Sequence, residues 1–328
     1  MELPNVLREA LEEELKGVSQ QALLSAAEKI SLRYRSRPGG LYIQNRQEAL
    51  AYALSRMPAT FGAVQKALSY TLEALEGMPD EKKTFEAPVS LLVMGAGTGA
   101  AVWAASELLE LSSVTCLEYA PAMRETGQSL LRHGKGVLEK TRWKSIDLVS
   151  GPVEEKADLV VASYMLNEMD RAYRLQVAEK AWQAAEKLLL IIEPGTPEEY
   201  GVLRDIRRAL SERGAYVLAP CPNQGDCPIS ETDWCHFSCR VQRSRLHKMA
   251  KSGDAPYEDE KFSYLAFVKE EPLKKEGTRI LRHPYIGKGY VKLELCGKDG
   301  ILQKTLSKRD EELYKSARKK DWGDWLEF

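Results

Sequence analysis

The sequence predicts an α/β fold in which a mainly parallel sheet lies between layers of helices. Three observations predict it. Short apolar runs alternate with longer helical segments from residue 89 onward, a glycine-rich turn follows the first of these runs, and residues 1–78 show only helical patterns. Buried parallel strands are near-continuous apolar runs, and the helices that connect them cover both faces of the sheet through right-handed crossovers.

The composition is that of a globular protein. Of the 328 residues, 44% are hydrophobic and 29% are charged, which excludes a disordered or collagen-like chain. No apolar run approaches the roughly 18 residues that a membrane-spanning helix needs, so we expect no contact with a membrane. The first ten residues are partly acidic and lack the pattern of a signal or transit peptide, which predicts a cytoplasmic protein.

Residues 1–86 are predicted to form a helical N-terminal domain. Asn45 precedes Glu48 by three residues, which is the spacing of a helix-capping pair, and a stretch of helix-forming residues follows. Pro58 is expected to end that helix, because a proline lacks the backbone N–H that a helix interior needs. Thr60 is then expected to cap a second helix.

Residues 87–218 are predicted to form the sheet domain. The expected strands cover residues 89–94, 114–117, 146–149, 159–162, 188–192 and 215–218. The expected helices cover residues 100–110, 121–138, 171–186 and 197–213. One more strand is expected at 261–269, so that residues 261–278 form the last sheet strand and a linker.

The remaining segments are divided by composition. Residues 219–260 form a Cys-rich insertion, residues 279–328 a basic extension with a hairpin and a final helix, and residues 78–88 a polar linker between proline residues. The Asp-Gly pair at 299–300 lies between alternating apolar and polar runs and predicts the turn of the hairpin. Ser307, with an aspartate three residues later, predicts the start of the final helix.

A glycine-rich turn joins the first expected strand to its helix. Its residues, which we expect to bind a cofactor, are Gly95, Ala96, Gly97, Thr98 and Gly99. Glycines allow a sharp turn and a close approach of the backbone to a ligand. Glu118, nineteen residues after the last of these glycines, ends the second strand, where a carboxylate can accept hydrogen bonds from both ribose hydroxyls of a nucleoside cofactor.

The spacing of the glycines decides between two cofactor classes. A dinucleotide site usually has the pattern G-x-G-x-x-G. Here the pattern is G-x-G-x-G, which resembles motif I of the methyltransferases that depend on S-adenosylmethionine, although Val93 stands where they often have an acid. The strand at 261–269 is similar to their antiparallel seventh strand. The predicted fold is therefore a Rossmann-like seven-strand methyltransferase sheet, with a dinucleotide site or a turn without ligand as alternatives.

Polar residues follow the fourth expected strand. Asn167 is assigned to the cofactor site, and Tyr164 and Glu168 are expected near a methyl acceptor, because ligands bind at the carboxyl ends of strands in open α/β sheets. The alternative for all three is helix capping and packing against the sheet. The sequence indicates no catalytic residue.

Six cysteines are present, and four of them lie within nineteen residues. These four are Cys221, Cys227, Cys235 and Cys239, and in a reducing compartment such a group binds metal more often than it forms disulfides. The spacing lacks the paired C-x2-C of many zinc sites, which favours a 4Fe–4S cluster over zinc. Free thiols are the remaining alternative. Cys296 ends a predicted strand and is a further candidate ligand.

The end of the chain is basic. Residues 240–328 contain 21 Lys and Arg against 15 Asp and Glu, whereas the rest of the chain is net acidic. Such a patch is a candidate surface for nucleic acid, and the alternatives are an ordinary solvated surface and compensation of a helix dipole. The residues that we expect to contact RNA phosphates are Arg240, Arg243, Arg245, Lys248, Lys251, Arg318, Lys319 and Lys320.

Several motifs spread over nearly the whole chain carry a resemblance to a known family. They include Arg-Met-Pro-Ala-Thr-Phe-Gly at 56–62, Asp-Trp-Cys-His-Phe at 233–237 and Glu-Lys-Phe-Ser-Tyr at 260–264. With them the chain resembles the methyltransferase-like mitochondrial small-ribosomal-subunit assembly proteins and their bacterial relatives, and we identify it as similar to a bacterial-type member.

The resemblance implies a function and a set of ligands. It implies a methyltransferase-like domain at 87–218 and a cluster-binding insertion at 219–260. It assigns a 4Fe–4S cluster to Cys221, Cys227, Cys235 and Cys296, with Cys239, which stands where the family usually has Gln, as the alternative fourth ligand. It also implies action on the small ribosomal subunit, close to rRNA, in assembly or translation.

Three functional hypotheses follow. The first is an S-adenosylmethionine-dependent, methyltransferase-like, iron–sulfur protein that acts on the rRNA of the small ribosomal subunit. The second is a catalytically inactive assembly factor that uses the same fold as an RNA-binding scaffold. The third is a small-molecule methyltransferase that zinc stabilises. The sequence does not predict an oligomeric state.

Overall fold

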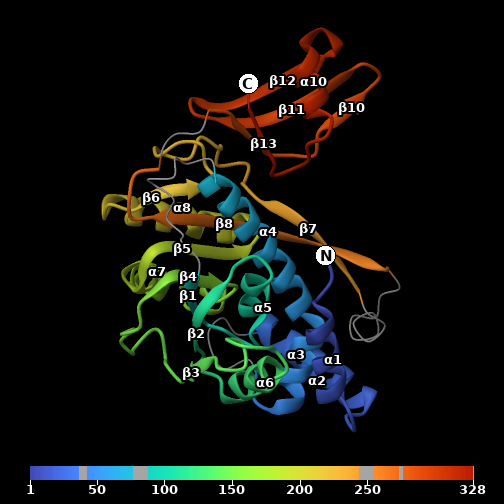
Figure 1. Cartoon of the computed structure of the whole chain (residues 1–328), viewed down its shortest axis with the longest axis vertical. Coiled ribbons are helices and arrows are strands. Elements are labelled where there is room, and N and C mark those ends of the chain that lie inside the picture. Colours follow the sequence, from blue (N-terminus) through green and yellow to red (C-terminus); the bar gives the residue numbers. More distant parts are fainter. Residues whose placement is uncertain (37–42, 77–87, 244–254, 273–275, 328) are drawn as a thin grey trace. The chain divides into compact units, whose positions relative to one another are not determined.

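The computed structural model describes residues 1–36, 43–76, 88–243, 255–272 and 276–327 (Figure 1). The chain forms two compact units. The first unit contains Met1–Leu68, Phe85–Glu193 and Cys239–Glu260, and the second contains Ser69–Thr84, Pro194–Ser238 and Lys261–Phe328. Most of the predicted linker at 78–88 lies outside the described residues.

The first unit contains a parallel sheet with the strand order β3-β2-β1-β4-β5. Its strands are β1 (Val89–Met94), β2 (Leu111–Leu117), β3 (Arg142–Lys144), β4 (Ala157–Ser163) and β5 (Ala185–Pro194). The central residues are fully buried, and Val93 lies opposite Cys116 on one side and Val161 on the other. The apolar runs of the sequence are thus sheet strands with both faces covered, which confirms the predicted α/β class.

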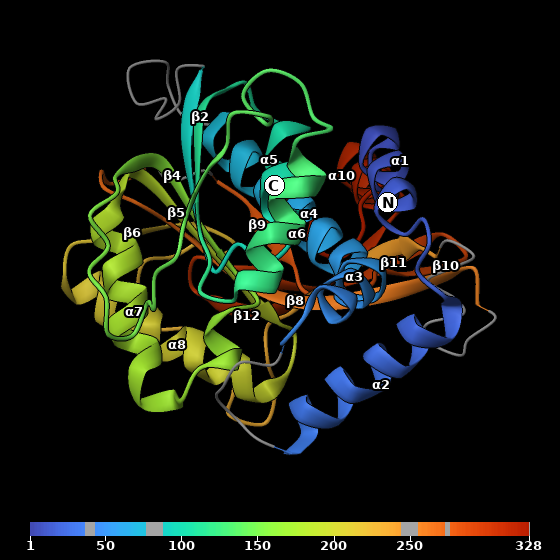
Figure 2. The same ribbon diagram turned by 90° about the horizontal axis from the view of Figure 1, so that it is seen from below.

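Helices connect these strands and cover both faces of the sheet. They are α5 (Ala100–Ser106), α6 (Pro121–Leu131) and α7 (Arg171–Ala184). Figure 2 shows α5 and α6 on one side of the strands and α7 on the other. Helix α5 and helix α6 are shorter than predicted, because turns follow them where the sequence pattern continued to look helical.

One predicted strand is wrong. Residues 146–149 are not in the sheet, and β3 is formed earlier by residues 142–144, which pair with β2. Leu148 is buried, and with Ile146 and Val149 it lines a cavity of the first unit. Apolar residues around a cavity form the same kind of short run as a buried strand, so hydropathy alone did not separate the two.

Among the described residues four helices precede the sheet, and polar side chains, Ser19 and Asn45, cap two of them. They are α1 (Asn5–Glu14), α2 (Gln20–Ser36), α3 (Arg46–Ser55) and α4 (Met57–Glu76). The Asn45 side chain accepts a hydrogen bond of 3.0 Å from the Glu48 backbone N–H, as predicted. Pro58 lies in the first turn of α4, where its missing N–H costs nothing. Thr60 is therefore inside the helix, and its predicted capping role is wrong.

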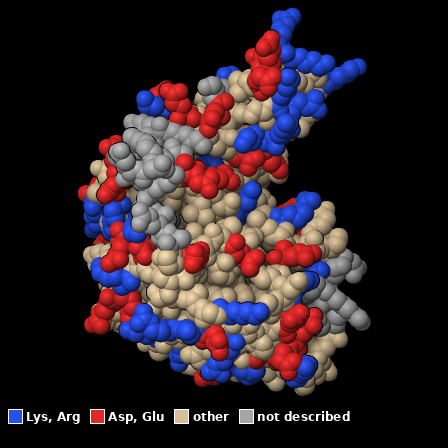
Figure 3. All heavy atoms as spheres, viewed as in Figure 1, with Lys and Arg blue, Asp and Glu red and all other residues tan. Residues whose placement is uncertain are grey.

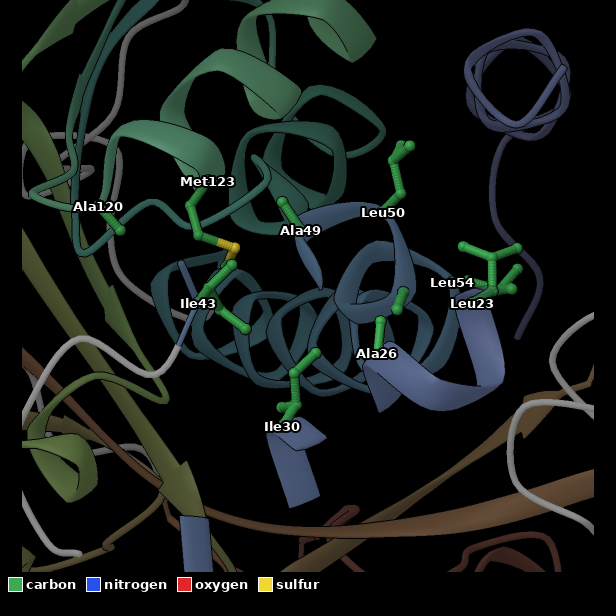
Figure 4. Packing of buried hydrophobic residues seen from close by; sticks show 10 residues of the cluster. Leu23, Ala26, Ile30, Ile43, Ala49, Leu50, Leu54, Ala120 and Met123 are labelled. Carbon is green, nitrogen blue, oxygen red and sulfur yellow. The ribbon is translucent and has the colours of Figure 1, made fainter. Parts of the chain in front are cut away.

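The N-terminal helices pack against the start of α6. Figure 4 shows the Met123 side chain turned toward Ile43, and Leu54 of α3 beside Leu23 of α2, all in one buried cluster. A pair of hydrogen bonds of 2.6 and 2.7 Å between the Arg33 guanidinium and the Glu48 carboxylate also joins α2 to α3. Because Ala120 and Met123 follow directly after β2, this packing brings the N-terminal helices beside the glycine turn.

The second unit begins with one more helix and an antiparallel strand pair. Helix α8 (Pro197–Glu212) leads to β6 (Tyr216–Ala219), which pairs with β8 (Tyr257–Val268) so that Val217 lies opposite Phe267. This pairing confirms the predicted antiparallel last strand. A short strand, β7 (Phe237–Gln242), also pairs with β8.

A small antiparallel sheet forms the rest of the second unit. It consists of β9 (Thr278–Ile280), β10 (Tyr285–Gly287), β11 (Tyr290–Gly297), β12 (Gly300–Ser307) and β13 (Trp325–Leu326), with helix α10 (Glu311–Ala317) against one face. Gly297 and Gly300 pair across the hairpin turn, and Ser307 forms a capping box with Asp310. The predicted hairpin turn is confirmed, whereas Ser307 caps the 3₁₀ turn Lys308–Asp310 that precedes α10 and not α10 itself.

None of the described helices combines the length and the hydropathy that crossing a membrane requires.

Candidate cofactor and metal sites

The backbone of the glycine turn has a conformation that other residues adopt only with strain. Gly95, Gly97 and Gly99 have φ angles of 64°, 57° and 90°. A Cβ atom at Gly95 would also lie 2.8 Å from the Cβ of Met165. Glycine is therefore required here by conformation and by space, and the turn presents its backbone to the cavity that Gly95 and Gly97 line.

Glu118 is fixed beside this turn. One carboxylate oxygen accepts a hydrogen bond of 2.7 Å from the Gly97 N–H, and the other accepts one of 2.8 Å from the Ala120 N–H. Burial raises the pKa of this carboxyl group, and the two N–H groups oppose the shift. Each oxygen retains a free lone pair, so the carboxylate can also accept hydrogen bonds from a ligand.

A cavity of about 640 Å³ opens beside the turn, a volume in the range of small-molecule sites. Four acids and five tyrosines line it: Glu118, Asp147, Glu168, Asp170, Tyr34, Tyr52, Tyr119, Tyr164 and Tyr173. Among the described residues that line the cavity, none is Lys or Arg. This lining favours a cationic ligand and disfavours a pyrophosphate.

Two polar side chains of the cavity, those of Thr98 and Glu168, differ from ordinary buried groups, one in its hydrogen bonding and one in its pKa. The buried hydroxyl of Thr98 has no hydrogen-bond partner among the described residues. Burial, against a hydrogen bond from the Tyr34 hydroxyl that lowers it and together with the nearby charge of Glu118, raises the pKa of Glu168 to about 7. The cavity thus contains one carboxyl group that titrates near neutral pH.

Tyr164 has an unusual backbone at the end of β4. Its φ angle is 54°, in the left-handed region that a bulky residue rarely adopts. The ring is held by a hydrogen bond of 2.8 Å from its hydroxyl to the Glu260 carboxylate. Backbone strain of this kind is concentrated at functional sites.

Two of the predicted cofactor residues do not line the cavity. Gly99 caps helix α5, and Asn167 supports the turn after β4 by donating its backbone N–H to the Glu193 carboxylate at 3.2 Å. Conversely, the sequence analysis missed Tyr34 and Tyr52. They come from α2 and α3, far from the glycine turn in sequence, and no motif marks them.

A second cavity is lined by four cysteines, all in the second unit. These are Cys221, Cys227, Cys235 and Cys296. The first three come from the loop between β6 and β7. Cys296 comes from β11, where alternation sends Leu295 into the core against α10 and Cys296 toward the opposite face.

The other two cysteines lie elsewhere. Cys239 is buried on β7 in the first unit, where its sulfur lies 3.1 Å from the position that a Cβ of Gly62 would occupy. Cys116 is a fully buried residue of β2. Neither residue lines the cysteine cavity.

The thiols of this cavity affect one another. Burial raises the pKa of Cys235 well above its usual value, and the charges of the other three cysteines raise it further. The Tyr200 hydroxyl lies 3.1 Å from the Cys227 sulfur, and Ser263 donates a hydrogen bond of 2.7 Å to the Cys235 carbonyl. In the part of the chain that the structure describes, no group of three or more His, Cys, Asp or Glu residues is arranged to hold a metal ion.

Two buried arginines also line the cysteine cavity. Arg207 donates from one terminal nitrogen to the Asn223 carbonyl at 3.0 Å, but its Nε and its other terminal nitrogen have no hydrogen-bond partner among the described residues. Arg279 donates to the Gly323 carbonyl at 2.7 Å and lies 5.1 Å from the centre of the Trp325 ring. Because guanidinium groups remain charged, this cavity favours an anionic occupant.

His236 packs against aromatic rings near the cysteine loop. Its ring stacks on Trp234 with 4.9 Å between centroids, and burial lowers its pKa. It does not line the cysteine cavity.

The predicted RNA contacts fall into three groups. Arg240 and Arg243 form ion pairs of 2.8 and 2.7 Å with Asp259 and Glu258. Residues 318–320 are at the end of α10, where Lys319 and Lys320 border a shallow hollow. Arg245, Lys248 and Lys251 lie outside the described residues.

Comparison with known proteins assigns the chain to a group. A model of the family described as mitochondrial small ribosomal subunit Rsm22 matches residues 46–327. The human mitochondrial ribosome assembly protein METTL17 is 27% identical over 85% of this chain and 62% of its own length. The mitochondrial Rsm22-cox11 tandem protein 1 of Schizosaccharomyces pombe is 22% identical over 81% of this chain and 43% of its own. The chain therefore spans about half the length of these curated relatives.

Solved structures with a similar fold are more distant in sequence. Magnesium protoporphyrin IX methyltransferase of Synechocystis, solved with bound SAH, is 12% identical over 76% of this chain and 97% of its own, with a TM-score of 0.42. A ribosomal protein L11 methylase of Lactobacillus delbrueckii is 14% identical over 60% of this chain and 78% of its own, with a TM-score of 0.34.

The matches correct one prediction. A cytoplasmic location was inferred from the first ten residues, but the family and both curated relatives are described as mitochondrial. The prediction is wrong because the composition of a short segment at the start of the chain is independent of the fold that identifies the family.

Proposed function

Because this chain belongs to the Rsm22 family of mitochondrial small-ribosomal-subunit proteins, we propose that it acts on the small ribosomal subunit and its rRNA during assembly. We further propose that it binds S-adenosylmethionine and a 4Fe–4S cluster. The observation that carries the proposal is the extent of the family match, which includes the glycine turn, the four acids of the first cavity and all four cysteines of the second.

The acid-lined cavity is the proposed site of S-adenosylmethionine. The sulfonium and ammonium groups give this cofactor a net positive charge, which suits a lining with four acids and no Lys or Arg among its described members. Glu118 would accept from the ribose hydroxyls, and the Thr98 hydroxyl would gain a partner. When bound, the cofactor supplies a methyl group; the residues named here bind it and shield it from water.

The cysteine cavity is the proposed site of the cluster. Four thiols, one buried and three half-buried, and the unpartnered nitrogens of Arg207 line the same space. Thiolates and inorganic sulfides together form a negative group, so guanidinium donors fit the chemistry of this donor set. Cys221, Cys227, Cys235 and Cys296 would hold the cluster and join the loop after β6 to strand β11.

The proposed action on the ribosome is tested by sedimentation. Mitochondrial extract containing the tagged full chain is separated on a sucrose gradient at low salt, and the chain is expected in the fractions of the small subunit or its precursors. High salt should release it, because phosphate contacts are screened. Finding the chain only in the free-protein fractions under both conditions contradicts the proposal.

A catalytically inactive scaffold is the alternative favoured by one observation. The Glu118 oxygens already accept hydrogen bonds from the Gly97 and Ala120 N–H groups, so they have less capacity for the cofactor than an unbonded carboxylate would. In addition, Val93 stands where methyltransferases often have an acid. Calorimetry with S-adenosylmethionine and the rRNA modification profile of a deletion strain separate the two. The third hypothesis, a zinc-stabilised small-molecule enzyme, requires zinc in place of iron and sulfide after anaerobic purification.

A further inference from the structure

The C-terminal sheet has one face in the protein core, and the other face is exposed at Lys292 but buried at Cys296, which lines the cysteine cavity. On β11, Val291, Leu293 and Leu295 are buried against α10. The intervening residues point to the opposite face. There Lys292 lies opposite Tyr285 of β10 on one side and opposite Thr305 of β12 on the other.

Two tyrosines of this outer face lie side by side. Tyr285 is 61% exposed, and its ring centroid lies 6.1 Å from that of Tyr290, with 34° between the planes. Tyr290 pairs with Gly287, and a Cβ at Gly287 would collide with the Tyr290 ring. The ring therefore lies across the glycine, in a fixed position, and the pair presents aromatic surface at low cost in side-chain entropy.

Positive charge surrounds the two rings. The Lys292 ammonium lies 5.8 Å from the centre of the Tyr290 ring. Lys288 is exposed in the β10–β11 turn, and Lys308 approaches the same turn at Gly289. Among the described residues none of these three lysines forms an ion pair, and Figure 3 shows Lys and Arg gathered over this part of the second unit.

From this arrangement we propose that Tyr285, Tyr290 and Lys292 form a stacking platform for single-stranded RNA. Unpaired bases stack on exposed aromatic rings, and lysines beside the rings meet the phosphates. The proposal rests on the proposed action on rRNA, and it specifies that this sheet contacts single-stranded parts of the RNA. It also moves the contact away from Arg240 and Arg243, whose charges are paired with acids.

Single strands fit this surface better than a duplex or a protein does. In a duplex the base faces are stacked on one another and cannot reach the tyrosines. A protein partner would need acidic side chains to match the lysines and, next to them, flat apolar groups to cover the two tyrosine rings. Nucleic acid supplies both the flat apolar faces and the negative charge.

The test measures binding of the full chain to a labelled RNA of about 12 nucleotides, single-stranded or as a duplex, by fluorescence anisotropy. Tyr285→Ala should weaken single-strand binding by roughly 5- to 100-fold, the range expected for one lost stacking contact. Tyr285→Phe, which keeps the ring, should bind like the wild type. Lys292→Gln should reduce the slope of log affinity against log salt by about 0.7.

Leu302→Ala is the matched control. Leu302 is 37% exposed on the same hairpin, but it pairs with Leu295 and belongs to the other face, so its loss should leave binding unchanged. Equal binding by wild type and Tyr285→Ala overturns the platform, as does an equal loss for single strand and duplex. If all variants including the wild type fail to sediment with small-subunit particles, the proposed function fails instead.

Discussion

The two cavities of this chain have opposite electrostatic character. In the first unit, acids and tyrosines surround a glycine turn, and no Lys or Arg is among the described lining residues. In the second unit, four thiols share a cavity with the buried side chains of Arg207 and Arg279. One chain thus contains a site suited to a cation and a site suited to an anion, and each can be disturbed by substitutions that leave the charge balance of the other intact.

The largest effect is expected from Cys235→Ser. Loss of one thiolate should remove iron from the protein and lower the unfolding temperature by about 10 °C or more, because the cluster would join distant segments of the second unit. Iron and sulfide analysis after anaerobic purification, with thermal unfolding, measures both. Cys239→Ser is the control, since that thiol lies outside the cavity. A Cys235→Ser protein with full iron content would show that the thiols of the second unit do not hold a cluster.

Next in size is the effect of Glu118→Ala on the cation site. Removing a charged acceptor of ribose hydroxyls should weaken S-adenosylmethionine binding by roughly 10- to 100-fold in calorimetry. Glu125→Ala, an exposed acid on α6, should change nothing. An unchanged affinity in the Glu118 variant would mean that the cofactor binds elsewhere or not at all.

A smaller, pH-dependent effect is expected from Glu168. Its folded-state pKa is about 7, above the usual 4.5, so the unfolded chain ionises first, and stability should fall as pH rises from about 4.5 to about 7. Binding of the cationic cofactor should instead tighten as pH rises through about 7, because the carboxylate becomes charged. Tyr34, Tyr52 and Glu118 face this group.

Glu168→Gln tests both trends, since an amide cannot ionise. Calorimetry and thermal unfolding across this pH range should give flatter profiles for the variant than for the wild type. If the wild-type profiles are already flat, Glu168 does not titrate in this range.

The smallest effect is expected from Arg207→Met. The variant keeps the volume of the side chain but removes the charge and the free donors, so a bound cluster should have a reduction potential more negative by tens of millivolts. Redox titration followed by electron paramagnetic resonance measures the shift. Arg208→Met, an exposed neighbour on α8, is the control. Equal potentials would show that Arg207 does not face the cluster.

Prediction from sequence succeeded where local pattern and tertiary environment agree. The strands β1, β4 and β5 are apolar runs because they are buried on both faces, and Asn45 and Ser307 cap helices through contacts within three residues. The glycine turn could be recognised in the sequence because its positive φ angles require glycine.

Prediction failed where the environment is made by distant segments. Tyr34 lines the acid-lined cavity only because α2 packs against α3, and no residue near Tyr34 in the sequence indicates this packing. Arg207 looks like any surface arginine of an amphipathic helix until the Cys-rich loop covers it. Cys296 was added to the ligand set by family resemblance, because its distance along the chain hides its proximity in space.

The place of Cys296 in the chain has a consequence for biosynthesis. It follows Cys221 by 75 residues, and it points into the cavity only when strand β11 is paired in its native register; a slip by one residue would exchange it with Leu295. A nascent chain therefore cannot present all four thiols until its final hairpin has been translated and has folded. The cavity with its four thiols is therefore complete only after this hairpin has been synthesised, and a chain truncated before the hairpin would lack the Cys296 thiol.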